Sequence, residues 1–401
     1  MLKEYFDGLT EGLAKKIAER KTGRRLLAYE TGRLGQRMFN PRYSVAWTNV
    51  FVPFELLLSM DVAGFFIEFV GGMVASTGVA PGFLQRAEQA GYSTDGCSYH
   101  RCTLGAAMEN LIPAPDLLIG ATIPCDGGLQ TVNELGRLYG KKVFVLNIPH
   151  NFSGESVRYL THQFEEMIEY ITEMTGKVMD YDRLRHIVHL SNDARGHLVD
   201  IFGIAKNIPS PVTGRDLKNF AIIFALLLGT EEGVEVARLF YDELKSRLET
   251  GAGGMSKEKY RLLWIQNRIQ FKTRLIEHLE ENYGANVVVD ELNHIHWEDM
   301  DEDRPLESLA ERMMTHPFNG PIQRRLDTMK HLAVEYKVVG AINPSHWGCR
   351  QSCGARTLFR NALQEVGVPV MNLDVDCVDE RNYSEGQVLT RLEGFMEMIE
   401  K

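Results

Sequence analysis

The stretch Pro344-Ser345-His346-Trp347-Gly348-Cys349-Arg350-Gln351-Ser352-Cys353-Gly354 contains two of the six cysteines in this chain. A helical segment and a short strand are expected after it, and a third cysteine, Cys377, follows that strand. The same order occurs once upstream, in Cys97, Cys102 and Cys125. The gap between the second and third cysteine is 22 residues upstream and 23 residues downstream. The two sets account for all six cysteines, which indicates a shared function rather than packing.

The composition is that of a globular protein with more than one domain. The 401 residues are 44% hydrophobic and 24% charged, and the formal net charge is −10. No stripe rich in Lys and Arg is visible, so the sequence predicts neither nucleic acid nor an anionic membrane as a partner. The first residues lack the pattern of a secretory signal, and no window approaches 18 uncharged apolar residues. We therefore expect a cytoplasmic protein whose cysteines stay reduced.

The chain is expected to contain two α/β domains joined by helices. Residues 1–152 and 256–401 alternate apolar runs with amphipathic helices, which is typical of doubly wound, flavodoxin-like parallel sheets. Residues 153–255 predict a mostly helical connecting region. The expected strands are 25–30, 64–69, 115–122 and 142–148 in the first domain, and 261–265, 286–292, 338–342 and 368–373 in the second. The main expected helices are 2–20, 53–60, 129–138, 182–206 and 271–282.

Every cysteine falls in or beside a loop that follows a predicted strand. Ligands of doubly wound sheets bind beyond the carboxyl ends of the strands. Cys102 and Cys353 are expected to open helices, where the positive end of the dipole favours a thiolate. If the two α/β domains face each other, three cysteines from each converge on one cleft between them.

Three alternatives to a shared cysteine site compete with it. Buried cysteines are common in proteins, but duplicated spacing at strand ends argues against chance. Disulfides are disfavoured in a reducing compartment. Zinc is the main rival, although structural zinc usually takes four ligands from paired knuckles. Two sets of three thiolates fit two four-iron cubanes better, with one iron of each cubane lacking a cysteine.

Several motifs resemble the 2-hydroxyacyl-CoA dehydratase and benzoyl-CoA reductase family, in order and over most of the chain. The motifs are Cys97-Ser98-Tyr99-His100-Arg101, Leu104-Gly105, Cys125-Asp126-Gly127, His346-Trp347-Gly348-Cys349-Arg350 and Arg381-Asn382-Tyr383-Ser384-Glu385-Gly386-Gln387. The resemblance implies α/β domains that hold an iron–sulfur cluster and receive low-potential electrons from a separate ATP-hydrolysing activator. The usual three cluster ligands of the family map onto Cys97, Cys125 and Cys349.

The other three cysteines depart from the usual dehydratase pattern. Cys102, Cys353 and Cys377 double the ligand set, which is similar to the double-cubane cluster branch of the family. That likeness implies an [8Fe-9S] double cubane, with a single [4Fe-4S] cluster as the alternative. It also implies a homodimer, an ATP-hydrolysing iron–sulfur reductase as partner, and a small-molecule substrate.

A few further side chains are candidates for a function. His100 and His346 are candidate proton or hydrogen-bond donors to the cluster. Asp126 and Asp376 are expected to cap the helices that follow them. The pair His294 and His296 is a weak metal signal, and a solvated loop is the expectation. Arg101 and Arg350 each adjoin a cysteine and are weaker candidates for the same hydrogen-bonding role toward the cluster.

Sequence alone leaves three functional hypotheses. The chain lacks a phosphate-loop motif and a dinucleotide fingerprint, so no ATP or NAD site is expected in it. The first hypothesis is an iron–sulfur reductase component supplied with electrons by its partner. The second is a subunit of a 2-hydroxyacyl-CoA dehydratase or aryl-CoA reductase. The third is a non-catalytic metal-binding scaffold.

Overall fold

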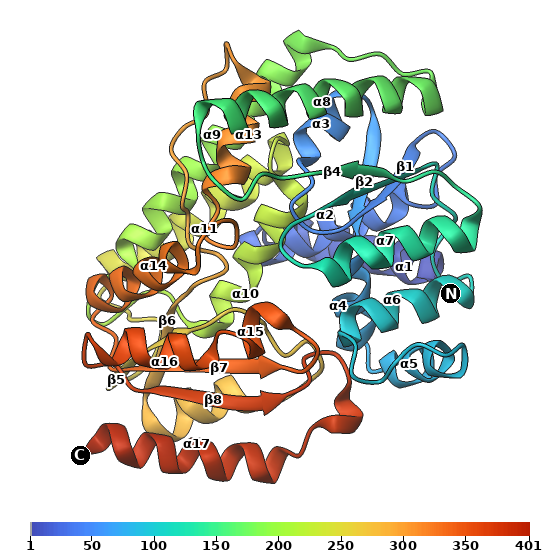
Figure 1. Ribbon diagram of the computed structural model, residues 1–401. Helices are drawn as coiled ribbons and strands as arrows, with labels where there is room; N and C mark the ends of the chain where they lie inside the picture. The colour runs from blue at the N-terminus through green and yellow to red at the C-terminus, as the bar shows by residue number, and fades with distance from the viewer. Residues whose placement is uncertain (1) are drawn as a thin grey trace.

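Two four-stranded parallel sheets form the framework of the molecule (Figure 1). The computed structural model describes residues 2–401, without the side chains of residues 219, 221, 222, 224 and 225. The first sheet has the order β2-β1-β3-β4 and the second the order β6-β5-β7-β8. The strands are β1 Ser44–Thr48, β2 Val62–Phe66, β3 Leu117–Ala121, β4 Phe144–Leu146, β5 Tyr260–Trp264, β6 Ala285–Asp290, β7 Gly340–His346 and β8 Val370–Val375.

Both sheets repeat the same topology. The first strand of each sheet lies in its interior, because β1 pairs with β2 and β3, and β5 pairs with β6 and β7. This order matches the first four strands of a flavodoxin-like sheet. The predicted fold class is confirmed. In such a sheet the crevice for ligands opens where neighbouring strands lead off to opposite sides, at β1/β3 and β5/β7.

Helices cover the first sheet and precede it. They are α1 Leu2–Glu19, α2 Gly23–Arg37, α3 Phe54–Ser59, α4 Ile67–Ser76, α5 Ala80–Gln89, α6 Ser98–Met108 and α7 Asp126–Tyr139. The predicted helices 2–20 and 53–60 correspond to α1 and α3. The predicted strand 64–69 is displaced: β2 ends at Phe66 and α4 begins at Ile67.

The predicted strand 25–30 is wrong, because these residues lie inside α2. Thr22 caps that helix by accepting a hydrogen bond from the backbone N–H of Arg25. Leu26, Leu27 and Glu30 are buried on one face of the helix. A short apolar run does not distinguish a buried helix from a strand by periodicity. The first strand is β1, which the sequence did not reveal.

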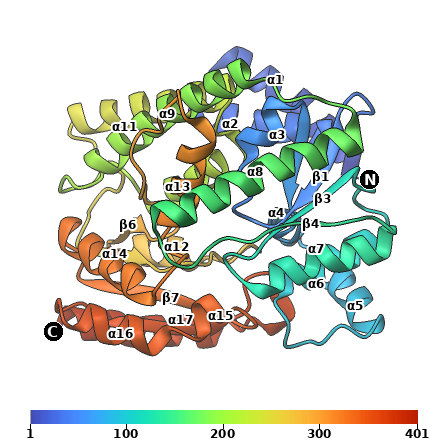
Figure 2. The same ribbon diagram turned by 45° about the horizontal axis from the view of Figure 1, so that its top comes forward.

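The central helices pack on both halves of the molecule. They are α8 Gly154–Thr175, α9 Tyr181–Ile204, α10 Gly214–Ile222 with the π-helical turn Ile223–Leu227, and α11 Glu231–Glu249. Figure 2 shows α9 and α11 side by side, whereas α8 crosses in front of the first sheet. Phe164 and Met167 of α8 share a core with Ile119 of β3. The domain boundaries at 152 and 255 stay a prediction.

The helices of the second half range from 4 to 16 residues in length. They are α12 Leu275–His278 with the π-helical turn Leu279–Tyr283, α13 Pro305–Thr315, α14 Ile322–Glu335, α15 Arg350–Cys353, α16 Arg356–Gln364, the 3₁₀ turn Glu380–Asn382 and α17 Glu385–Glu400. The sequence predicts a helix over 271–282, but the observed helix begins at Leu275, four residues after the predicted start. β7 runs on to His346, so it leads directly into the cysteine-bearing stretch.

One apolar core joins the two halves. It contains Trp47 and Phe65 from the first sheet, Leu262 and Ile342 from the second, and Phe220 of α10 between them. This shared core fixes the relative position of the two sheets, because a packed interior does not slide freely. Within the described residues, no helix is long and apolar enough to cross a membrane.

Candidate metal centre

Three cysteines occupy the residue immediately before a helix. Cys97 precedes α6, Cys125 precedes α7 and Cys349 precedes α15, and none of the three side chains caps its own helix. Each sulfur therefore starts beside backbone N–H groups that favour negative charge. The prediction that Cys102 and Cys353 open helices is wrong. Cys102 lies inside α6 and Cys353 ends α15, because these helices begin at Ser98 and Arg350.

The cysteine-bearing segments of the two halves touch each other. Cys97 Sγ lies 3.4 Å from Nε2 of His346. Gly348, at φ +72°, sits so close to the upstream segment that a Cβ there would lie 2.6 Å from the backbone N of Cys97. Two further contacts cross between the halves: Gln351 donates to the carbonyl of Pro124, and Ser98 donates to Asp376. The two cysteine sets thus face a common seam between the halves.

His346 is held in one orientation in this seam. The backbone N–H of Cys377 donates to its Nδ1 at 3.0 Å, so a neutral ring carries its proton on Nε2. That proton points at Cys97 Sγ. Tyr99 meets the ring edge-on with centroids 5.4 Å apart. The arrangement makes His346 a fixed hydrogen-bond donor to the sulfur.

His100 stands beside the same sulfur from the first half. Its Nε2 lies 3.3 Å from Oε1 of Glu68, a residue in the first turn of α4. Burial opposes the charged form of His100, but the Cys97 thiolate and Glu68 outweigh it and raise the pKa of His100 well above its usual value. Conversely, burial opposes the thiolate of Cys97, yet His100 and His346 hold the pKa of Cys97 well below its usual value. Cys97 is therefore poised as a thiolate.

Burial raises the pKa of four of the remaining thiols. It takes Cys102 to a pKa of about 12 and Cys125 to a pKa of about 11, and it also raises the pKa values of Cys349 and Cys377. The Cys97 thiolate adds to the rise in pKa at Cys125, Cys349 and Cys377 by repulsion. These sulfurs thus share one electrostatic neighbourhood. A positively charged metal group would favour the thiolate form of all of them.

Cys102 is the most separate of the six. It is fully buried in the apolar core on α6. The Asp376 carboxylate contributes to the raised pKa values of both Cys102 and Cys377, which places Cys102 near the turn that carries Cys377. Cys353 lies in the second half, where its sulfur donates a hydrogen bond to the carbonyl of His346 at 2.9 Å.

The donor set suits an iron–sulfur group. All six cysteines are free thiols, and thiolates are the usual ligands of iron–sulfur clusters, whereas hard cations prefer oxygen. Beside Cys349, the Asn267 amide lowers the pKa of the thiol by hydrogen bonding, and its buried Nδ2 has no other hydrogen-bond partner among the described residues. An unpaired donor of this kind suits an additional acceptor such as a sulfide. Between residues 2 and 401, no three His, Cys, Asp or Glu side chains converge as ligands of a single metal ion.

A charged network closes one end of the seam. Arg101 and Arg381 both bind Glu88, and Arg381 also binds Asp379. Arg101 and Glu88 belong to the first half and the other two residues to the second. Glu88, bound by Arg101 of its own half and by Arg381 of the other half, therefore ties the halves together.

The prediction that Asp126 and Asp376 cap the following helices is wrong for both residues. Asp376 accepts the backbone N–H groups of Val378 and Asp379, so it stabilises the turn after Cys377. The residue that caps the following 3₁₀ turn is Asp379. Asp126 lies in the first turn of α7 and binds Arg350 of the other half at 2.7 Å.

The prediction of a solvated loop at His294 and His296 is wrong. Nδ1 of His294 and Nε2 of His296 are buried, without a hydrogen-bond partner in the described part of the chain. The His296 ring packs against that of His316 with centroids 4.2 Å apart. Burial lowers the pKa of His294 to about 4 and that of His296 to about 3. Both rings are therefore neutral at physiological pH.

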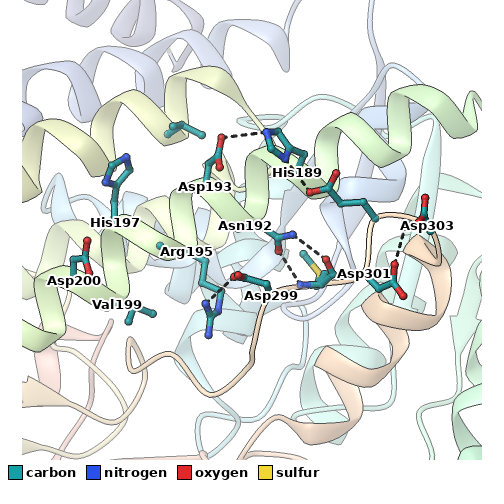
Figure 3. A pocket seen from close by; sticks show the side chains of 14 residues that line it. His189, Asn192, Asp193, Arg195, His197, Val199, Asp200, Asp299, Asp301 and Asp303 are labelled. Carbon is teal, nitrogen blue, oxygen red and sulfur yellow. Dashed lines mark hydrogen bonds and ion pairs between the residues drawn. The ribbon is translucent and has the colours of Figure 1, made fainter.

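A surface groove of about 990 Å³ lies beside this loop (Figure 3). It runs between α9 and residues 299–303. Its charged side chains bind one another: Arg195 pairs with Asp299, and His189 pairs with Asp193 and Glu302. The groove belongs to the surface and is not lined by the cysteines.

Sequence reasoning missed three polar residues near the sulfurs. Gln266 donates to Cys349 Sγ at 3.4 Å, and Asn267 follows it. Both come directly after β5, so the rule that ligand residues follow strands would have found them. Glu68 falls inside a predicted strand, and no sequence signal distinguishes it.

Two parallel sheets of flavodoxin-like order, with three free cysteines in each half, define an α/β protein. The family model of the 2-hydroxyglutaryl-CoA dehydratase D-component matches residues 49–399, and the chain belongs to this family. The predicted resemblance is confirmed at this level, while the double-cubane branch stays a prediction.

Curated relatives match nearly full-length at low identity. The chain is 26% identical to the (R)-phenyllactyl-CoA dehydratase alpha subunit of Clostridium sporogenes, over 88% of this chain and 89% of that protein. It is 27% identical to a benzoyl-CoA reductase subunit of Thauera aromatica, over 86% of each. It is 22% identical to the lactoyl-CoA dehydratase alpha subunit of Anaerotignum propionicum, over 98% of each. The relatives include both dehydratase and reductase subunits, so the family defines an enzyme subunit without fixing its reaction.

Proposed function

We propose that the chain is an iron–sulfur reductase component that holds a double-cubane [8Fe-9S] cluster. It receives low-potential electrons from an ATP-hydrolysing iron–sulfur partner and passes them to a small unsaturated molecule. When bound, the cluster supplies one-electron chemistry at low potential. The six ligands would be Cys97, Cys102, Cys125, Cys349, Cys353 and Cys377.

The observation that carries this proposal is the meeting of the two cysteine sets at one seam. The 3.4 Å contact between Cys97 Sγ and His346 Nε2 joins the first set to the second. The repulsion that Cys97 exerts on Cys349 and Cys377 extends the same neighbourhood. Three sulfurs from each half match a cluster built from two cubanes with an incomplete protein ligand set.

Two histidines would hold and donate protons at this site. His346 holds a proton on Nε2, directed at Cys97. His100 holds its charge between Cys97 and Glu68. Both would donate a proton to a ligand bound at the seam, and His100 would be reprotonated through Glu68.

The partners follow from the family and from the chain itself. The curated relatives are named as subunits, which supports assembly with a second chain, and we propose a homodimer. Electrons come from outside because the sequence has no phosphate loop or dinucleotide fingerprint.

Metal analysis after anaerobic purification tests the proposal. Two cubanes predict about eight irons per chain together with acid-labile sulfide, whereas one cubane predicts about four. A chain with zinc and no sulfide contradicts both cluster types. Reduction of the chain by an ATP-hydrolysing partner then separates a reductase from a scaffold that only binds metal.

One observation favours the dehydratase or aryl-CoA reductase subunit as second candidate. Cys97, Cys125 and Cys349 alike precede helices and are partly exposed, whereas Cys102 and Cys377 are fully buried. A single [4Fe-4S] cluster on the first three would leave Cys102 free. Cys102→Ser then retains all its iron and its spectrum, whereas a double cubane predicts loss of about half the iron.

A further inference from the structure

Gln266 has an unusual place in the chain. It follows β5 after one residue and has φ +51°, in the left-handed region that favours glycine. Its side chain is only 7% exposed. This backbone conformation turns the amide toward the seam, where Nε2 lies 3.4 Å from Cys349 Sγ. A strained residue at a functional site indicates that its direction matters.

The orientation of this amide is forced by its other neighbour. Its Oε1 accepts a hydrogen bond from Nη2 of Arg325 at 2.8 Å. A guanidinium has only donors, so the oxygen must face Arg325 and the NH₂ group must face the sulfur. The reversed amide would place two donors together at Arg325 and an oxygen against Cys349.

Arg325 is in turn immobilised. It forms a bidentate pair with Glu291 and donates to the carbonyl of Gln351 at 2.6 Å. Its guanidinium lies 4.3 Å from the ring centroid of Phe318 and 4.4 Å from that of Phe359. Arg325 is 1% exposed, and Glu291 is also buried. Four of its five N–H donors are thereby engaged with protein acceptors, so Arg325 serves as a support and not as a binding group.

We propose that Gln266 is a positioning residue that sets the reduction potential of the metal group through Cys349. Its amide donates permanently to the ligand sulfur, and the Arg325–Glu291 pair keeps it in that orientation. A donor to a ligand sulfur stabilises the reduced, more negative state of an iron–sulfur cluster. This inference rests on the proposed function, since it needs a cluster held by Cys349.

Two substitutions at Gln266 test the inference in the iron-loaded protein. Gln266→Leu removes the donor, and Gln266→Glu keeps the shape but puts an oxygen against the sulfur. Both are expected to shift the midpoint potential, measured by redox titration followed by EPR, to more negative values, with the larger shift for Glu. The lost hydrogen bond also predicts roughly fivefold faster loss of iron to a chelator.

Gln163 provides a matched control. It is 6% exposed and makes two hydrogen bonds to the backbone of Asn147, both 2.8 Å long, and no cysteine is among its hydrogen-bond partners. Gln163→Leu should lower the melting temperature as much as Gln266→Leu while leaving the potential and the iron-loss rate unchanged. Arg325→Met, which frees the amide, should shift the potential in the same direction as Gln266→Leu.

The outcomes separate this inference from the proposed function. Iron-loaded variants of Gln266 whose potential and iron-loss rate equal those of the wild type overturn the role of the amide alone. A shift as large in Gln163→Leu overturns it as well, since the effect would then reflect general destabilisation. A wild-type chain that purifies without iron and sulfide overturns the proposed function and the inference with it.

Discussion

The two halves of the molecule repeat their sheets and their cysteine spacing, but they surround their sulfurs differently. In the first half, Cys97 lies beside the charged pair of His100 and Glu68. In the second half, Cys349 receives a neutral amide from Gln266. The repeated pattern therefore supplies equivalent positions for sulfur without equivalent electrostatics. Two metal-binding subsites built this way would differ in potential even with identical ligands.

Disrupting the close approach of the halves at Gly348 is expected to have the largest effect on stability. Alanine at Gly348 would place its Cβ 2.6 Å from the backbone N of Cys97, at φ +72°. Because backbone cannot move aside cheaply, we expect Gly348→Ala to lower the free energy of unfolding by about 3 kcal/mol. Urea denaturation of the wild type and the variant measures this difference in the free energy of unfolding. Gly367→Ala is the control: it has φ +77° but open space around it, so only the conformational cost of about 1 kcal/mol remains. Equal losses in the two variants would show that the halves do not press together there.

The charged character of the first half can be tested at Glu68. Its Oε1 faces His100 and its Oε2 accepts the backbone N–H of Val50 at 3.1 Å. Glu68→Gln keeps an acceptor for Val50 and removes the charge, so we expect a loss of about 2 kcal/mol in unfolding free energy at neutral pH.

The pH dependence of that loss follows from the raised pKa of His100. A group with a folded pKa above its unfolded value stabilises the fold fully below the unfolded pKa, and this contribution fades as pH rises through the folded pKa. The difference between wild type and Glu68→Gln, measured by urea denaturation from pH 6 to 10, should therefore shrink at the alkaline end. A constant difference would mean that the loss does not depend on the charge of His100.

The neutral histidines of the second half predict the opposite pH dependence. His296 has a folded pKa of about 3 because of burial, well below its unfolded value. Its neutral form therefore stabilises the fold above the unfolded pKa, and stability falls as pH drops from about 6.5 toward 3. The expected slope is about 1 kcal/mol per pH unit, followed by thermal unfolding between pH 7 and 4. His296→Phe should reduce the slope by about this amount and leave the contributions of the buried His294 and His316, whereas replacing the exposed His162 should not reduce it.

The parts of this architecture that the sequence predicted are those with strong local signals. The β7 segment and its cysteines stood out because a buried strand ends in a loop rich in Gly and Cys. The α2 helix was misread because Leu26 and Leu27 are adjacent, and a buried surface on a short helix looks like a strand. The predicted position of Cys102 at a helix start was also wrong, because α6 begins at Ser98, whose side chain contacts Asp376 of the other half. Such a contact, 278 residues away, leaves no local pattern.

The smallest expected effect concerns the ion pair between Arg350 and Asp126, which also crosses the seam. Its distance of 2.7 Å resembles that of the buried pair between Arg101 and Glu88, but the Arg350 side chain is 84% exposed. Water and salt screen an exposed pair, and ordering a long side chain offsets most of its attraction. Arg350→Ala should therefore change the free energy of unfolding by no more than about 0.5 kcal/mol, measured by urea denaturation at low and high salt. A much larger, salt-dependent loss would mean that the rim of the seam is held by charge, and that the tight packing at Gly348 is a consequence of this pair rather than its cause.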